Sequence, residues 1–295
     1  MVFIRVKKVK GLDYYYLIKS KWDQDKKKSK QQIIKYLGNV HNFTIEDIPL
    51  EYRNNPNILS KLLLKTQERE EKFFLIKELK KQVFKSLRNG EVDKILKIVE
   101  KYEKQASLSE FYDDILKQVM YEVGELWQQN KLDVGTEHVC SNIANQAIHI
   151  INKRYNQRDK KDSVLICTPE GEIHNISCNV IESILLEKGF HIFNISPSIP
   201  SDSIIKYIKD INPSMILISV TLVENLGSAK RLIKKISAYT NIPVIIGGQA
   251  INNLSKQEQL DIDSVNPKVK IYTDHTLKTL PKNIKVLIKD NYKNI

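Results

Sequence analysis

The stretch that decides the fold is Val164–His174, with the sequence VLICTPEGEIH. Its first four residues are continuously apolar, which is typical of a strand buried on both faces of a parallel sheet. The apolar run ends before Thr168, and the loop that follows contains Glu172 and His174. Parallel α/β sheets bind ligands beyond the carboxyl ends of their strands, so we expect this loop to lie at a ligand-binding edge.

Further apolar runs follow at the intervals that a doubly wound sheet requires. The predicted strands are Val164–Cys167, His191–Ile195, Met215–Val220, Pro243–Ile246 and Val269–Tyr272. The predicted helices lie near Cys178–Lys188, Ser201–Ile211, Val223–Ala238, Ala250–Gln259 and Lys282–Asn291. Right-handed crossovers between such strands give a flavodoxin-like or Rossmann-like domain, which we assign to residues 163–295.

Residues 61–156 have the period of helices and precede a charged linker. One predicted helix runs from Lys61 towards Leu87 and a second covers Val92–Tyr102. A third is capped by Ser107 or Ser109 and ends near Trp127, and a fourth is capped by Asp133 and runs to about Ile150. Four helices joined by short loops predict an antiparallel bundle that forms a cap.

The chain begins with strand-like runs at Val2–Val9, Leu12–Trp22 and Ser29–Val40. Lys10-Gly11 and Asp23–Lys28 supply the turns between them, so residues 1–42 are expected to form a small antiparallel sheet. Residues 43–60, with two prolines, are interpreted as a linker. The predicted fold class is therefore α/β plus α, with a β-rich N-terminal segment.

Charge is concentrated in this first segment. The whole chain has a formal net charge of +12, and residues 1–40 alone hold eleven Lys or Arg and three Asp, which is +8. Such asymmetry favours a basic appendage that meets phosphates, with nucleic acid as the partner. The equally weighted alternative is that the lysines only keep the protein in solution.

Composition excludes several other classes. No apolar run approaches the roughly 18 residues needed to span a bilayer, and the N-terminus lacks the pattern of a signal peptide. The three cysteines show no paired metal spacing and are interpreted as reduced, mostly buried thiols, with Cys167 in the core. We therefore expect a cytoplasmic protein that makes no membrane contact.

The polar residues at the predicted sheet edge suggest a metal ligand. His174 follows Glu172 by two residues, so the carboxylate can hold one ring nitrogen while the other binds a transition metal. Ser219 and Thr221 end the third strand, and Gly247-Gly248 follow the fourth. A lone loop histidine is more often a surface residue, however, and a lone diglycine is more often an ordinary turn.

A second constellation lies in the helical region. Trp127 is followed, after nine residues, by Glu137 and His138. This spacing places a large aromatic ring and an acid–imidazole pair around one helix–loop–helix junction. Trp127 could also be a plain core residue, whereas burying both Glu137 and His138 without partners would be costly.

Residues from about 80 to 249 resemble the cobalamin-binding module of CarH-type regulators, which are MerR-family and adenosylcobalamin-dependent, and of related corrinoid proteins. The segment LKQVMYEVGELWQQNKLDVGTEH is similar to the family's Trp, nine residues, Glu-His signature. EIHNIS resembles its cobalt-binding loop, SVT its hydroxyl-bearing strand edge, and GGQA its closing diglycine.

The resemblance implies a role for each matched residue. His174 would ligate cobalt from below, Glu172 would orient the imidazole, and Ser219 would support Glu172. Thr221, Gly247 and Gly248, together with Ser219, would contact the nucleotide tail. Trp127 would cover the upper face of the corrin with Glu137 and His138 beside it, an arrangement that favours adenosylcobalamin over methylcobalamin.

Two positions depart from the family pattern. The loop glycine is Ser177 here, which would either crowd the nucleotide tail or cap the helix that follows. Gln128 stands where some light sensors carry a histidine that binds cobalt after photolysis. An amide is a poor cobalt ligand, so the same photoadduct is not expected. The N-terminus also lacks a MerR-type helix-turn-helix pattern.

Two functions follow from the resemblance. The first is a sensor or transcriptional-regulator-like module, with a photoreceptor as one form of it, in which the upper ligand or its loss by light alters self-association or exposes the basic sheet to nucleic acid. The alternative is a corrinoid shuttle for a methyltransferase partner. In both, the chain is a binding protein and not an enzyme. A degenerate module without corrin, supported only by Ser177, and a radical mutase are less favoured.

Overall fold

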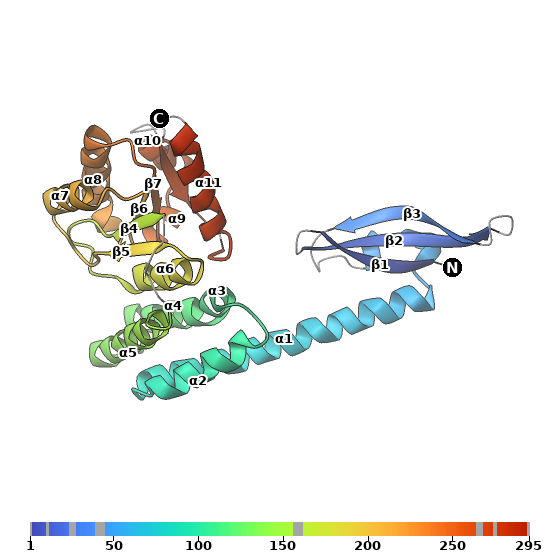
Figure 1. Ribbon diagram of the computed structural model, residues 1–295. Helices are drawn as coiled ribbons and strands as arrows, with labels where there is room; N and C mark the ends of the chain where they lie inside the picture. The colour runs from blue at the N-terminus through green and yellow to red at the C-terminus, as the bar shows by residue number, and fades with distance from the viewer. Residues whose placement is uncertain are drawn as a thin grey trace. The chain divides into compact units, whose positions relative to one another are not determined.

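The computed structural model describes residues 2–9, 12–23, 28–38, 45–155, 162–263, 268–273 and 276–293 (Figure 1). The chain divides into two compact units, Met1–Glu78 and Leu79–Ile295. The long helix α1 (Pro56–Arg88) contributes residues to both. Each unit is considered by itself below.

The first unit contains the predicted antiparallel sheet. Its strands are β1 (Val2–Val9), β2 (Leu12–Asp23) and β3 (Lys28–Gly38), in the order β1-β2-β3. The predicted strands are confirmed, whereas the turns and the end of the third predicted strand lie outside the described residues. One face of the sheet forms a small core, whose buried members are Val2, Ile4, Tyr15, Leu17, Ile48 and Ile58.

The predicted linker over residues 43–60 is wrong in its second half. Two short 3-10 turns, η1 (Ile45–Asp47) and η2 (Leu50–Tyr52), precede α1, which begins at Pro56 and not at Lys61. Proline is accepted at the first position of a helix because its missing N–H would have no intrahelical partner there. Ile48 and Ile58 pack against the sheet, so this segment covers its apolar face.

The second unit opens with the helical bundle. After the end of α1 come α2 (Val92–Glu103), α3 (Leu108–Phe111), the π-helical turn η3 (Tyr112–Leu116), α4 (Lys117–Gln128) and α5 (Val134–Asn152). Ser107 and Asp133 cap their helices as predicted, and Ser107 forms a capping box with Glu110. The third predicted helix therefore exists but contains a π turn.

The parallel sheet has the strand order β5-β4-β6-β7-β8. The bounds are β4 (Ser163–Cys167), β5 (His191–Asn194), β6 (Met215–Ser219), β7 (Val244–Gly247) and β8 (Val269–Tyr272). Every adjacent pair is parallel. This is the flavodoxin-like order, with the switch point between β4 and β6, so the predicted fold is confirmed.

Helices cover both faces of this sheet. On one face lie α6 (Ile176–Glu187) and α11 (Leu280–Lys293), and on the other lie α7 (Ser201–Ile211) and α8 (Leu226–Tyr239). A 3-10 turn, η4 (Val223–Asn225), precedes α8. The single helix predicted for Ala250–Gln259 is wrong, because α9 (Gln249–Asn252) and α10 (Lys256–Asp263) are separate.

The bundle packs on the α6 side of the sheet, where α5 lies against α6 (Figure 1). A buried hydrogen bond of 2.8 Å joins the hydroxyl groups of Tyr112 and Ser183. The Asn145 side chain donates to Asn175, the N-cap residue of α6, at 3.2 Å and accepts from Asn179 on α6 at 2.9 Å. The bundle and the parallel sheet are thus joined by polar contacts along one helix.

All three cysteines are free and buried, as predicted, and Cys167 lies in the core of the parallel sheet. None of the helices in the described ranges combines the length and the apolar character that a bilayer crossing requires.

Candidate functional site

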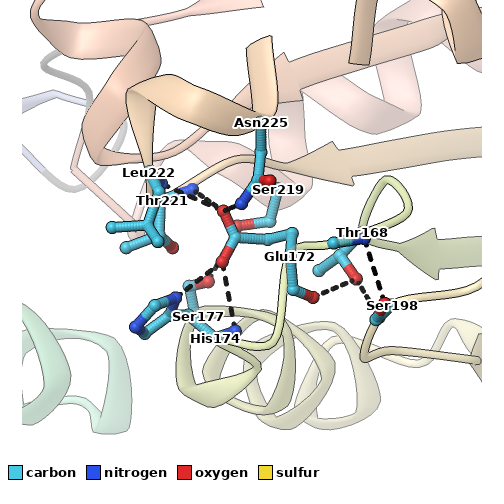
Figure 2. Close-up of polar contacts among 10 residues, drawn as sticks. Thr168, Glu172, His174, Ser177, Ser198, Ser219, Thr221, Leu222 and Asn225 are labelled. Carbon is cyan, nitrogen blue, oxygen red and sulfur yellow. Dashed lines mark hydrogen bonds and ion pairs between the residues drawn. The ribbon is translucent and has the colours of Figure 1, made fainter. Parts of the chain in front are cut away.

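A fully buried carboxylate, Glu172, organises the loop that follows β4 (Figure 2). Its Oε1 accepts a hydrogen bond from the His174 backbone N–H at 3.1 Å and lies 2.6 Å from His174 Nδ1. Its Oε2 accepts from the backbone N–H groups of Thr221 and Leu222 at 2.8 and 2.9 Å, and from Asn225 Nδ2 at 3.0 Å. Both oxygens are therefore fixed by the protein.

Hydrogen bonds also fix the rest of this loop. Thr168, at the end of β4, donates to the Glu172 carbonyl oxygen at 3.1 Å, and its hydroxyl accepts from the Ser198 N–H at 2.7 Å (Figure 2). The Gly171 N–H donates to the Ser198 hydroxyl at 3.0 Å. Gly171 has a φ of +91°, a conformation that favours glycine. These contacts fix the backbone of the loop that leads to His174.

The network fixes the tautomer of His174. An ionised carboxylate can only accept a hydrogen bond, so Nδ1 carries the proton of the neutral ring and Nε2 then has a free lone pair. The side chain is 47% exposed, which makes Nε2 accessible to a ligand. The hydrogen bond to Glu172 raises the pKa of His174, burial opposes this, and the charges of Glu172 and Glu137 add to the increase.

Glu172 remains ionised in spite of its burial. Burial by itself would raise its pKa, but the hydrogen bonds from His174, Leu222, Asn225 and Thr221 together lower it to about 2. A buried carboxylate with this many donors is a preformed acceptor. The Glu172–His174 pair predicted from sequence is thus confirmed as a contact, whereas Thr168, Leu222, Ser198 and Asn225 were missed.

The serine contacts differ from those implied by the resemblance. Oε2 of Glu172 is held by Thr221, Leu222 and Asn225, and the hydroxyl of Ser219 lies 2.8 Å from that of Ser177. The support of Glu172 by Ser219 stays a prediction. The suggested capping role of Ser177 is also wrong, because α6 begins at Ile176 with Asn175 as its N-cap residue.

The diglycine lies at the same sheet edge, where β7 ends. A Cβ atom on Gly248 would lie 2.3 Å from the Val220 carbonyl oxygen, and its φ is +117°. A Cβ atom on Gly247 would lie 3.3 Å from the Tyr272 carbonyl oxygen. Contacts within the fold are therefore sufficient to require glycine at Gly248, which agrees with the ordinary-turn interpretation.

The bundle presents the other predicted residues. Trp127 is in the last turn of α4 and is 45% exposed, so the core interpretation is wrong. Glu137 and His138 are in the first turn of α5, with 2.6 Å between Glu137 Oε2 and His138 Nδ1. Ser141 donates to Glu137 at 2.6 Å. The charge of Glu137 contributes to the raised pKa of His174.

The donor set suits a metal that is already held in a macrocycle. A corrin supplies most of the cobalt ligands itself, so one protein nitrogen is enough to complete the set. His174 offers a single half-exposed nitrogen, and its other ring nitrogen is held by a buried carboxylate. The residues present therefore fit cobalamin, and His174 is the residue that would hold its cobalt.

Comparison with known proteins also points to a B12-binding protein. A family model for a B12 binding domain matches residues 79–152, and a second matches residues 163–267. Dimethylamine corrinoid protein 1 of Methanosarcina acetivorans is 25% identical over 162 residues, which are 53% of this chain and 76% of that protein. The trimethylamine corrinoid protein of Methanosarcina barkeri is 25% identical over 140 residues, which are 45% of this chain and 64% of that protein.

The fold has a counterpart among solved structures. The monomethylamine corrinoid protein of Methanosarcina barkeri superposes with a TM-score of 0.57 at 13% sequence identity, over 71% of this chain and 99% of that chain. Both family models fall within the unit Leu79–Ile295. The chain therefore carries two adjoining B12-binding domains, a helical one over residues 79–152 and a Rossmann-like one over residues 163–267.

Proposed function

We propose that the chain is a corrinoid protein that carries a methyl group for a partner methyltransferase. The observation on which this depends is the Glu172–His174 pair, which aims one imidazole nitrogen from the sheet edge. Named relatives are corrinoid proteins for dimethylamine and trimethylamine, and they favour the carrier hypothesis over the regulator hypothesis. The chain itself is then a binding protein, and the chemistry of the methyl donor belongs to the partner.

Each residue has a defined task in this proposal. Cobalamin, when bound, supplies a cobalt that accepts and releases a methyl group. His174 holds the cobalt through Nε2, and Glu172 keeps the ring in the tautomer that leaves this nitrogen unprotonated. The placement of Trp127, Glu137 and His138 over the upper face of the corrin is carried over from the family resemblance. We take methylcobalamin, not adenosylcobalamin, as the form that is carried, because the named relatives are corrinoid proteins for methylamines.

The test is reconstitution with cobalamin followed by spectroscopy. The parent protein, labelled uniformly with 15N, should bind unlabelled hydroxocobalamin, and after reduction to Co(II) its electron paramagnetic resonance spectrum should show the doublet coupling of one 15N nitrogen, which can come only from the protein. His174→Ala should lose that doublet and bind on the order of tenfold more weakly. His149→Ala, at an exposed position in the last turn of α5, is the matched control and should keep both properties. An unchanged spectrum in His174→Ala would remove the proposal.

A second measurement separates carrier from sensor. Affinities for methylcobalamin and adenosylcobalamin are compared, and each complex is examined by sizing chromatography in the dark and after green light. The carrier proposal predicts methylcobalamin binding without a change in self-association. Preference for adenosylcobalamin together with a light-dependent change in size would support the regulator hypothesis instead.

A further inference from the structure

One face of the N-terminal sheet carries basic and aromatic side chains in register. The pairing places Arg5 opposite Tyr16, Tyr16 opposite Tyr36, and Lys7 opposite Tyr14. Because side chains alternate along a strand, these five residues share the face opposite the Val2, Ile4 and Leu17 core. We call Arg5, Lys7, Tyr14, Tyr16 and Tyr36 the tyrosine face.

The rings and cations of this face lie next to one another. The ring centroids of Tyr16 and Tyr36 are 5.3 Å apart, and those of Tyr14 and Tyr36 are 6.4 Å apart. Lys7 Nζ lies 5.4 Å from the centroid of the Tyr16 ring, and Arg5 donates to the Gln31 side chain. Tyr36 is 48% exposed, so a flat ligand can reach it.

The main buried cluster of the unit lies on the other face of the sheet, where Ile48 and Ile58 cover it. On the tyrosine side Ile18 is buried, and it pairs with Phe3 and Ile33. On the tyrosine side, Trp22 and Ile33 are also exposed, at 66% and 52%. The sequences of β1, β2 and β3 hold acidic residues only at the ends of β2, Asp13 and Asp23. The face is thus aromatic and cationic at once.

We propose that the tyrosine face binds a single-stranded nucleic acid. Every base has a π-face that can stack on an exposed tyrosine, and the phosphates between bases attract Lys7 and Arg5. A duplex is a poor ligand, because its bases are stacked inside and offer only phosphates to this face. The inference depends on the first unit alone and is independent of cobalamin.

The test uses the full chain and short labelled oligonucleotides of RNA and DNA, single-stranded and duplex, in fluorescence anisotropy. Single strands should bind more tightly than the duplex. Tyr36→Ser should weaken binding at least about fivefold, whereas Tyr36→Phe, which keeps the ring, should not. Circular dichroism of both variants checks that the sheet is folded.

Charge is tested by salt dependence with a matched pair of lysines. Lys7→Gln should reduce the slope of log affinity against log salt by about 0.7, the value for one phosphate contact on a single strand. Lys35→Gln removes the same charge from the opposite face, where Nζ donates to the Asp47 carbonyl oxygen at 2.7 Å, and should leave the slope unchanged.

Three results would overturn the inference. The first is duplex binding equal to or tighter than single-strand binding, because that indicates attraction by charge alone. The second is unaltered affinity in a folded Tyr36→Ser variant. The third is an equal loss of slope in Lys7→Gln and Lys35→Gln, because a specific face would then not be involved.

Discussion

At the scale of single residues, Glu172 determines which proton His174 carries. The carboxylate lies 2.6 Å from Nδ1 and has no exposed surface. A charged acceptor in a buried position holds the ring more firmly than a surface carboxylate would, because water does not compete for the hydrogen bond. The availability of Nε2 as a ligand therefore depends on a residue that need not touch cobalt.

Glu172→Gln should lower the pKa of His174 in the cobalamin-free protein. The main cause of the raised pKa is the hydrogen bond to the carboxylate, and a neutral amide supplies less stabilisation of the protonated ring. A titration of the histidine ring protons by NMR measures the change. Glu170→Gln, at an exposed position in the same loop, is the control and should leave the titration of His174 where it is.

The stability of the ligand-free protein should fall in acid through the same carboxylate. The pKa of Glu172 is about 2 in the folded protein and 4.5 in the unfolded chain, so its ionised form stabilises the fold above about pH 4.5. That contribution is lost as the pH falls from 4.5 through 2. Denaturant unfolding at several pH values should show the parent and Glu172→Gln converging in this window, and a constant difference would contradict the assignment.

Gly248→Ala should destabilise the protein by at least about 3 kcal/mol. The new Cβ atom would meet the Val220 carbonyl oxygen at 2.3 Å, and the backbone conformation is one that only glycine adopts without strain. Gly189→Ala provides the comparison, because Gly189 has a φ of +88° but no atom within 4 Å of the added carbon. It should lose only about 1–2 kcal/mol, from backbone strain alone. Equal losses in urea unfolding would show that the contact is relieved.

Sequence patterns predicted the contact between the Glu172 and His174 side chains, but not the backbone N–H groups that hold Glu172. The Glu172–His174 contact follows from a spacing of two residues in a loop after a strand. The N–H groups of Thr221 and Leu222 have no signature, because every residue except proline carries one. Asn225 was missed because residues 223–238 were predicted as one regular helix. Its first residues form the 3-10 turn η4 instead, and hydrophobic periodicity does not reveal such a turn.

At the scale of elements, the bond between Tyr112 and Ser183 links the bundle to the parallel sheet. Tyr112 begins the π turn η3, which shifts the direction of the side chains relative to a regular helix. Both hydroxyl groups are buried at a separation of 2.8 Å. Each would be left without a partner if the two domains separated at this point, so the bond favours the packed arrangement.

A double-mutant cycle should detect this link. Tyr112→Phe and Ser183→Ala should each destabilise the protein by about 1 kcal/mol, and the double variant by less than the sum of the two. Tyr239→Phe, at an exposed position, is the control and should have no effect. Additive losses measured by denaturant unfolding would mean that the two hydroxyl groups do not interact in solution.

Buried strands were predicted to within a residue, and irregular helices were not. β8 has the predicted bounds, β4, β5 and β6 differ from the prediction by one residue at one end, and β7 differs by one residue at each end. Continuous apolar residues mark such strands because both faces are covered. The break between α9 and α10 was missed because it depends on a cap, in which Ser255 and Glu258 exchange hydrogen bonds.

At the scale of the whole molecule, cobalamin binding and the tyrosine face belong to different units. Both family models lie within residues 79–267, and the tyrosine face lies within residues 5–36. A chain that begins at residue 79 should therefore bind cobalamin with the affinity of the full chain, and it should no longer bind single-stranded nucleic acid. Isothermal titration with cobalamin and anisotropy with oligonucleotides measure the two properties. Loss of both functions would show that the units are coupled.

The division into a basic sheet, a helical bundle and a parallel sheet could be predicted because the hydrophobic period changes from two to 3.6 and then to continuous runs. The boundary inside α1 could not. Its residues on both sides of Glu78 are charged and helical, and prolines at 49 and 56 suggested a linker where a helix begins. Local composition does not show that the first part of a helix packs in one hydrophobic core and its last part in another.

The hydrogen bonds of Glu172 have one more consequence. Its donors Thr221, Leu222 and Asn225 are about fifty residues further along the chain, after β6. A synthetic peptide spanning residues 168–179 would contain the histidine and the glutamate but none of these donors, so its carboxylate would be hydrated and its ring free to rotate. The orientation of the His174 ring is thus a property of the folded protein. Unfolding would remove it even though the histidine itself is chemically unchanged.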